Sequence, residues 1–158
     1  MPNYKGHLFG GVVIYLLLIA LLTKFWISGA IPTQKLILWF FACLLGSLFP
    51  DIDITSKGQR VYFILLFPLT IAALILKKWN LLFLLFLGIF FPLLIRHRGI
   101  THKPWFVVII PFIIFSIFAY GQPSQFGQTF IVYAFFTIGA ITHLLLDFGP
   151  KQFIKKLF

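Results

Sequence analysis

Six long apolar stretches, separated by short segments that carry proline, glycine and basic residues, make up most of this chain. They cover residues 8–27, 36–49, 61–76, 81–95, 105–120 and 129–148. Each is apolar throughout rather than alternating, which indicates helices and not barrel strands. Because the bilayer core has no water for backbone groups, such segments must satisfy their own hydrogen bonds. We therefore predict an all-α polytopic membrane helical bundle of about six helices, in a single integral membrane domain over residues 1–158.

The composition excludes an ordinary soluble protein. Soluble domains carry about 25% charged residues, whereas this chain carries 10%, with 61% hydrophobic residues and a mean hydropathy of +1.04. Several stretches hold only about 14 to 16 residues, fewer than the roughly 20 that cross a bilayer upright. Some helices are therefore expected to be thin spans, half-spanning helices or hairpins.

The basic residues indicate membrane topology. The formal net charge is +10, which in a soluble chain would suggest nucleic acid. Here the basic residues lie singly or in pairs between apolar stretches, as residues that orient helices and meet lipid headgroups do. With six spans, nine of them fall on one side and four on the other. We predict both termini in the cytoplasm, membrane lipids as partners and no nucleic acid.

All carboxylate and imidazole side chains fall in four short clusters, because the chain has three Asp, four His and no Glu. An ionisable residue beside a membrane span is by default a candidate for function. With six spans, all four clusters lie on the predicted cytoplasmic side. The seven residues are His7, Asp51, Asp53, His97, His102, His143 and Asp147.

The last cluster has helical spacing. His143 and Asp147 are four residues apart, so on a helix they share one face and both can reach one cation. The alternative is that the two side chains only bond to each other.

The Asp51 and Asp53 pair follows Pro50. Proline biases Phe49 away from helical geometry, and in an extended segment alternate side chains project to the same side. The two carboxylates would then lie together and repel unless a proton or cation sat between them. The alternative for Asp53 is a helix-capping or turn role.

His97 and His102 are five residues apart, which separates them by about 140° on an ideal helix. Joint ligation therefore needs a turn, which Gly99 makes easy. A loop at the membrane face fits this segment better than a helix. A purely structural role remains the alternative for His97 and for His7.

Together the clusters offer four imidazoles and three carboxylates, which suits two metal ions about 3.5 to 4 Å apart. Nitrogen and oxygen donors without thiolate suit Zn, Mn, Fe or Ni and do not choose among them. A divalent transition metal makes bound water a nucleophile near neutral pH. We predict hydrolysis without a serine or cysteine nucleophile, with catalytic roles for Asp51 and His102.

Basic residues flank these clusters. Guanidinium groups match phosphate oxygens in bidentate geometry, so a substrate with a phosphate at headgroup level is expected. Topology signalling explains the same residues equally well. The candidate phosphate-binding residues are Arg60, Arg96, Arg98 and Lys103.

These motifs resemble the YdjM-like membrane-bound metal-dependent hydrolase family of bacteria. The matching pieces are His7 with Gly10, the Phe-Pro-Asp-Ile-Asp segment 49–53 followed by Ser56, the box from His97 to His102, and His143 with Asp147. The resemblance implies a multi-pass inner-membrane hydrolase that uses these residues as metal ligands. The His and Asp arrangement is also similar to zinc-dependent phospholipase C, which implies lipid phosphodiesters.

The chain departs from the family pattern at two places. Lys103 stands where the family has serine, and Phe148-Gly149-Pro150 replaces a more polar ending. Both departures bear on substrate identity more than on metal binding.

The leading hypothesis is an integral membrane hydrolase in which a di-metal centre activates water against a phosphoester of a lipid or lipid-linked headgroup. One alternative is a metal ion or proton transporter, although transport sites usually lie near the bilayer midplane and these clusters lie at span ends. Another is a non-catalytic membrane adaptor held together by metal. The sequence does not indicate an oligomeric state.

Overall fold

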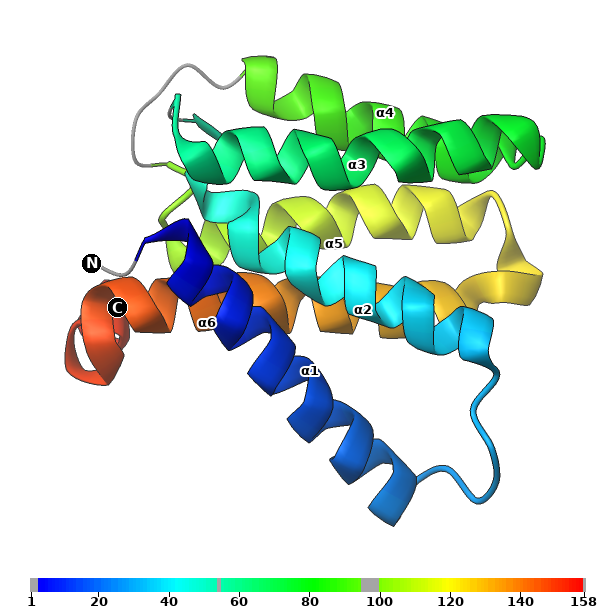
Figure 1. Ribbon diagram of the computed structural model, residues 1–158, viewed down its shortest axis with the longest axis horizontal. Coiled ribbons are helices and arrows are strands. Elements are labelled where there is room, and N and C mark those ends of the chain that lie inside the picture. The colour runs from blue at the N-terminus through cyan, green and yellow to red at the C-terminus, as the bar shows by residue number, and fades with distance from the viewer. Residues whose placement is uncertain (1–2, 54, 95–99, 158) are drawn as a thin grey trace.

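The computed structural model describes residues 3–53, 55–94 and 100–157, which form six α-helices and no β-strand (Figure 1). The predicted all-α bundle is confirmed, because each apolar stretch has become one helix. In chain order the elements are α1 (Tyr4–Phe25), α2 (Thr33–Leu48), η1 (Phe49–Asp53), α3 (Lys57–Ile75), α4 (Trp79–Leu94), α5 (Pro104–Tyr120), η2 (Pro123–Gln125) and α6 (Phe126–Leu157).

Among the described residues, four helical segments are long and apolar enough to cross a membrane: Tyr4–Phe25, Thr33–Ile52, Lys57–Ile75 and Pro123–Phe153. Two apolar helical segments are shorter, Trp79–Gly88 and Pro104–Tyr120. At 1.5 Å per residue α5 is about 25 Å long, less than the roughly 30 Å hydrocarbon core. The expected mixture of full and short helices is therefore present.

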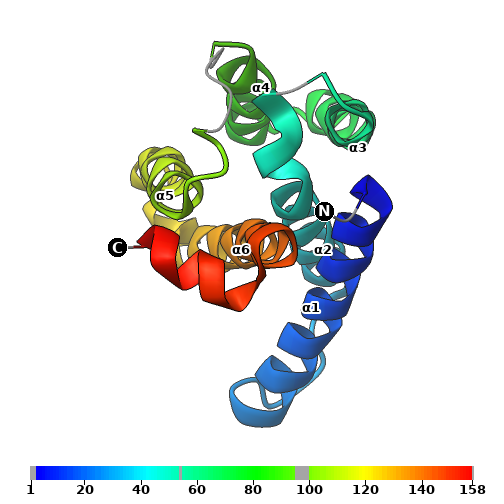
Figure 2. The same cartoon turned by 90° about the vertical axis from the view of Figure 1, so that its left-hand side faces the viewer.

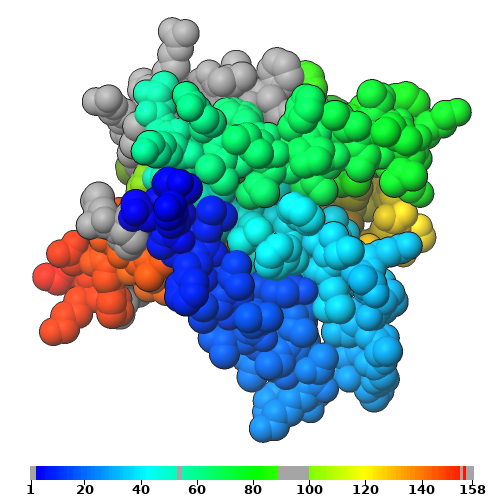
Figure 3. Space-filling model, in the orientation of Figure 1, coloured from blue at the N-terminus to red at the C-terminus, as the bar shows by residue number. Residues whose placement is uncertain are grey.

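Large apolar side chains cover the outside of the bundle. Phe9 is 71% exposed, Ile64 62% and Ile109 47%. Apolar patches on this scale are rare on soluble monomers, and they fit a surface that faces lipid. The end of α1 near Phe25 protrudes from the rest of the molecule (Figures 1 and 3).

Helices α2 and α6 pack together at the centre, α1 and α5 flank them, and the α3–α4 hairpin packs on the other side of α2 (Figure 2). Helix α1 begins, α2 ends, α5 begins and the chain terminates at the same end of the bundle (Figure 1). The described members of the four sequence clusters therefore lie at one end of the bundle.

Local signals explain where several helices begin. The Asn3 side chain caps α1 by accepting from the backbone N–H groups of Lys5 and Gly6, at 3.1 and 3.2 Å. Ser56 caps α3 by accepting from the Gln59 N–H at 3.0 Å. Pro104 is the first residue of α5, where its missing N–H costs nothing.

The prediction of an extended segment around Pro50 is wrong. Residues Phe49–Asp53 form a 3-10 helix, in which Phe49 has helical dihedral angles of φ −56° and ψ −40°. The fixed φ of proline suits a 3-10 turn as well as an extended chain. The 3-10 turn is favoured over an extended segment because it buries Phe49 and Ile52, and because the Gln59 side-chain amide donates to the Ile52 carbonyl at 2.8 Å.

Helix α6 breaks at Gly149, four residues before Phe153. Gly149 has φ 70° and ψ 160°, a left-handed backbone conformation that glycine adopts without a steric penalty. Pro150 follows directly. The predicted end of the last stretch at residue 148 coincides with this break, and a second short helical segment runs on to Leu157.

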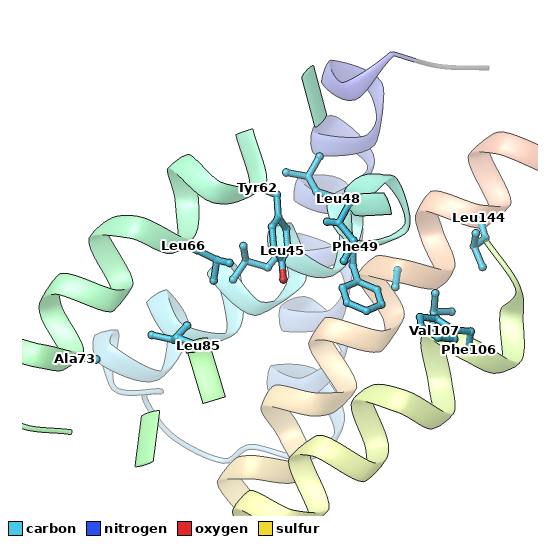
Figure 4. Close-up of a cluster of buried hydrophobic side chains, with 12 residues drawn as sticks. Leu45, Leu48, Phe49, Tyr62, Leu66, Ala73, Leu85, Phe106, Val107 and Leu144 are labelled. Carbon is cyan, nitrogen blue, oxygen red and sulfur yellow. The ribbon is translucent and has the colours of Figure 1, made fainter. Parts of the chain in front are cut away.

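Two glycines allow α2 and α6 to cross closely. A Cβ at Gly46 would collide with the Phe136 carbonyl, and one at Gly139 with the Cys43 carbonyl. Small residues allow this close approach of backbones in membrane bundles. Around the crossing, an apolar core joins α2, η1, α3, α4, α5 and α6 (Figure 4).

Candidate metal centre

Five of the seven predicted ligands come together at the end of the bundle where α1 begins. Segments far apart in the chain supply them: α1, η1, the residues before α5, and α6. The side chain of Asp53, and His97 entirely, lie outside the part that the structure describes. The five residues are His7, Asp51, His102, His143 and Asp147.

Four donor atoms surround one small space. His143 Nε2 lies 3.3 Å from Asp147 Oδ2 and 3.6 Å from Asp51 Oδ1. His102 Nε2 lies 3.5 and 3.7 Å from the same two oxygens. Two nitrogens thus alternate with two oxygens.

His7 extends the cluster on its buried side. Its Nε2 lies 3.4 Å from Asp147 Oδ1, so the two oxygens of Asp147 face different histidines. Its ring stacks on that of His143, with centroids 3.7 Å apart and an interplanar angle of 15°. Two overlapping donor groups could hold a metal ion: His7, His143 and Asp147, and Asp51, His102 and His143, with the donor atoms of each within 4.8 Å of one another.

The cluster is closed on one side and accessible on the other. The side chains of His143 and His7 are 0% and 2% exposed, and that of Asp147 is 5% exposed. Those of His102 and Asp51 are 17% and 22% exposed. A small molecule or headgroup can therefore reach the cluster from the Asp51 and His102 side.

Hydrogen bonds outside the cluster fix the orientation of two imidazoles. His143 Nδ1 lies 2.7 Å from the Ser47 carbonyl oxygen, which can only accept, so Nδ1 carries a proton. In the neutral imidazole, Nε2 then carries a lone pair. Thr101 Oγ1 donates to the Pro50 carbonyl at 2.8 Å and lies 3.4 Å from His102 Nδ1. Metal-binding histidines typically have such partners behind them.

The surroundings of His143 Nε2 point to a cation. When the imidazole is neutral, its Nε2 lone pair faces two carboxylate oxygens, and these three electron-pair donors repel one another unless a cation or a proton lies between them. His143 Nε2 and Asp147 Oδ1 are both buried without a hydrogen bond in the described structure, which is uncommon for buried polar atoms.

The spacing of the donors agrees with this reading. Charge-assisted hydrogen bonds between nitrogen and carboxylate are about 2.7 to 2.9 Å long, shorter than the 3.3 to 3.7 Å found here. Donors bound about 2.1 Å from a tetrahedral ion lie about 3.4 Å apart. The residues present therefore fit a divalent transition metal.

Gly58 at the start of α3 leaves room for Asp51. A Cβ on Gly58 would lie 2.9 Å from Asp51 Oδ2, so any side chain there would press on the carboxylate. The position explains why Asp51 turns Oδ1 toward both histidines while Oδ2 lies against α3.

The predicted phosphate-binding residues are less well defined. Arg60 and Lys103 are exposed and lie on the first turn of α3 and just before α5. Arg96 and Arg98 lie outside the described residues. A role for these four in substrate binding stays a prediction.

Sequence reasoning missed the residues that support the ligands: Ser47, Gly58, Thr101 and Gly139. Ser47 acts through its backbone carbonyl, for which no side-chain signal exists. Ala42 and Gly46 form a small-x-x-x-small pattern, which could have indicated the close crossing of α2. The position of Thr101 between the box glycine and His102 was a weaker hint.

Comparison with known proteins gives one result. A family model described as "YdjM inner membrane protein" matches residues 1–154, almost the whole chain. Neither the curated proteins nor the solved structures include a match to this chain.

Proposed function

The chain belongs to the YdjM inner membrane protein family, and on this premise we propose that it is an integral membrane, metal-dependent hydrolase. Its substrate is a phosphoester of a lipid or of a lipid-linked headgroup. The observation that carries the proposal is the buried His143 Nε2, which has no hydrogen bond in the described structure and lies 3.3 and 3.6 Å from carboxylate oxygens of Asp147 and Asp51.

We assign one ion to the four donors of His143, His102, Asp51 and Asp147 Oδ2. His7 and Asp147 Oδ1 form the beginning of a second site, for which Asp53 and His97 are the remaining candidates in the chain. Two ions held in this way would match the predicted stoichiometry. The donors suit Zn, Mn and Fe alike.

A divalent metal held by these residues would supply the Lewis acidity that makes water a nucleophile near neutral pH. The chain itself supplies proton transfer and positioning. Asp51 is the more exposed of the two carboxylates, 22% against 5% for Asp147, so we assign to it the proton of the attacking water. As the water oxygen bonds to phosphorus, the bond to the leaving alcohol oxygen breaks, and that oxygen takes up the proton that Asp51 accepted.

The substrate class follows from depth and access. The cluster lies at the ends of membrane-spanning helices, where lipid phosphates lie, and its exposed side is formed by Asp51 and His102. Arg60, Arg96, Arg98 and Lys103 are proposed to bind the phosphate through charge-assisted hydrogen bonds. We place this end of the bundle, with both termini, on the cytoplasmic side.

Metal analysis and lipid turnover test this proposal together. Detergent-purified protein is expected to hold about two transition-metal ions per chain and to release phosphate or headgroup from a panel of defined phospholipids in mixed micelles. His143→Ala is expected to abolish both metal binding and lipid turnover. Thr142→Ala, at the residue directly before His143, is expected to keep both. The absence of transition metal from the wild-type protein would refute the proposal, and so would full turnover by the His143→Ala variant.

The two alternatives predict different outcomes. A transporter would move metal or protons into proteoliposomes, with the flux lost in Asp147→Asn, yet all described ligands lie at one end of the bundle. A metal-held adaptor would bind the ions and unfold on their removal without ever hydrolysing a lipid from the panel. The hydrolase is favoured because the cluster has an accessible side, which a purely structural ion does not need.

A further inference from the structure

An apolar cavity of about 110 Å³ lies between the α3–α4 hairpin and the central helices α2, α5 and α6. Side chains from all five helices and from η1 line it, and among them are Leu45, Phe49, Tyr62, Leu66 and Leu85. Figure 4 shows Leu45, Tyr62 and Leu66 close together, with Phe49 on one side of them and Leu85 on the other.

The lining accepts hydrocarbon and rejects polar groups. None of the described lining residues is charged, and the Tyr62 hydroxyl already donates to the Gly88 carbonyl at 3.4 Å. A polar ligand there would lose its hydrogen bonds with water and gain none, which costs several kcal/mol. An engineered apolar cavity of about 150 Å³ stays dry and binds benzene, so a site of this size can hold a run of methylene groups.

The cavity begins directly beside the metal centre. On η1, Phe49 lines the cavity while Asp51 holds a carboxylate in the cluster. On α3, Gly58 packs against Asp51 Oδ2 and Tyr62, one turn further on, lines the cavity. At a rise of 1.5 Å per residue, Gly58 and Tyr62 are about 6 Å apart along the axis of α3.

We propose that the cavity binds one acyl chain of the lipid whose phosphoester lies at the metal centre. In a diacyl phospholipid, only the glycerol and an ester group separate the phosphate from the first methylenes, which suits a polar site and an apolar site one helical turn apart. This inference rests on the proposed function and narrows its substrate to lipids with acyl chains. It also gives the α3–α4 hairpin a role in substrate binding.

The test uses phosphatidic acid that carries a photoactivatable diazirine midway along one chain, mixed into phosphatidylcholine nanodiscs with the full-length protein. Mass spectrometry is expected to locate the cross-links on residues that line the cavity. Leu85→Trp, which fills the cavity, should reduce them at least fivefold, whereas Leu74→Trp, at a position on α3 that is 52% exposed, should leave them unchanged. Cross-links spread equally over the outer faces of α1 and α5, or unaffected by Leu85→Trp, would overturn the proposal.

A second variant covers the case in which tryptophan disturbs folding. Leu69→Ala widens the same cavity and is expected to increase cross-linking, while an unchanged or lower yield in this variant counts against an acyl site.

Turnover separates the two proposals. Cavity cross-links that respond to both variants, without hydrolysis of any lipid, would support the acyl site and remove the hydrolase. Equal kcat/KM for long-chain and dibutanoyl phosphatidic acid would keep the hydrolase and remove the acyl site.

Discussion

The α2–α6 pair and the α3–α4 hairpin are built in opposite ways. Where α2 meets α6, glycines bring the backbones so close that a single Cβ would collide with a carbonyl, and His143 bonds to the backbone of α2. Where the hairpin meets the same core, a cavity remains between the side chains. The closest packing thus lies beside the candidate donor atoms, and space is left where the proposed acyl chain would enter.

The largest effect is expected from His143→Ala, which removes the proposed ligand that the closely packed α2–α6 pair holds in place. Metal affinity should fall by more than the 10- to 100-fold that loss of a mere supporting partner costs. Isothermal titration with Zn²⁺ and metal analysis measure the change. Retention of wild-type affinity would mean that the α2–α6 pair does not bind the ion through His143.

Two separate glycine-to-alanine variants test the difference in packing between the α2–α6 pair and the α3–α4 hairpin. Gly139→Ala forces α2 and α6 apart and is expected to destabilise the protein by more than about 3 kcal/mol, the upper end for overpacking. Gly88→Ala on α4 meets no atom closer than 3.5 Å and should change stability by less than about 1 kcal/mol. Unfolding of both variants in mixed micelles, followed by circular dichroism, gives the two values; equal losses would erase the distinction between the halves.

Thr101→Val probes support on the accessible edge of the cluster. The change keeps the side-chain shape but removes the hydroxyl that contacts the Pro50 carbonyl and His102 Nδ1. Metal affinity or turnover should fall about 10- to 100-fold, as is typical for partners behind a ligand. Thr142→Val, whose hydroxyl bonds only within α6 to Ile138, is the matched control and should stay near wild type.

Arg60→Gln should have the smallest effect. Arg60 is exposed on the loosely packed hairpin, where a single charge interaction contributes about 0.2 to 1 kcal/mol. The KM for phosphatidic acid is therefore expected to rise by no more than about fivefold, with metal content unchanged. A loss of metal in this variant would connect the hairpin to the ion more directly than the structure indicates.

Sequence reasoning went furthest where the bilayer restricts the options. A long apolar segment in lipid must be a helix, so the six stretches located α1 to α6, and i, i+4 spacing placed His143 and Asp147 on one face. The convergence of His7, Asp51 and His102 on them followed from counting passes. The 3-10 turn at Asp51 could not be foreseen, because proline permits both geometries and the burial of Ile52 decided between them.

The groups that orient the candidate ligands could not be predicted from the sequence, for a different reason. The partner of His143 is a backbone carbonyl, and every residue has one. Only the close crossing at Gly46 and Gly139 selects the carbonyl of Ser47, and a crossing depends on how two distant helices pack. The cavity depends likewise on what the hairpin leaves unfilled.

The two carboxylates that face His102 and His143 also set a preference for ionic charge. When the imidazoles are neutral, Asp51 and Asp147 together carry a charge of −2, which balances one divalent cation held by the four donors. At that position a monovalent ion would leave an excess negative charge beside the hydrocarbon and a trivalent ion an excess positive one, each with a large solvation penalty. The first proposed site would therefore favour doubly charged ions, and a second ion would need further negative charge, for which Asp53 is the remaining carboxylate of the chain.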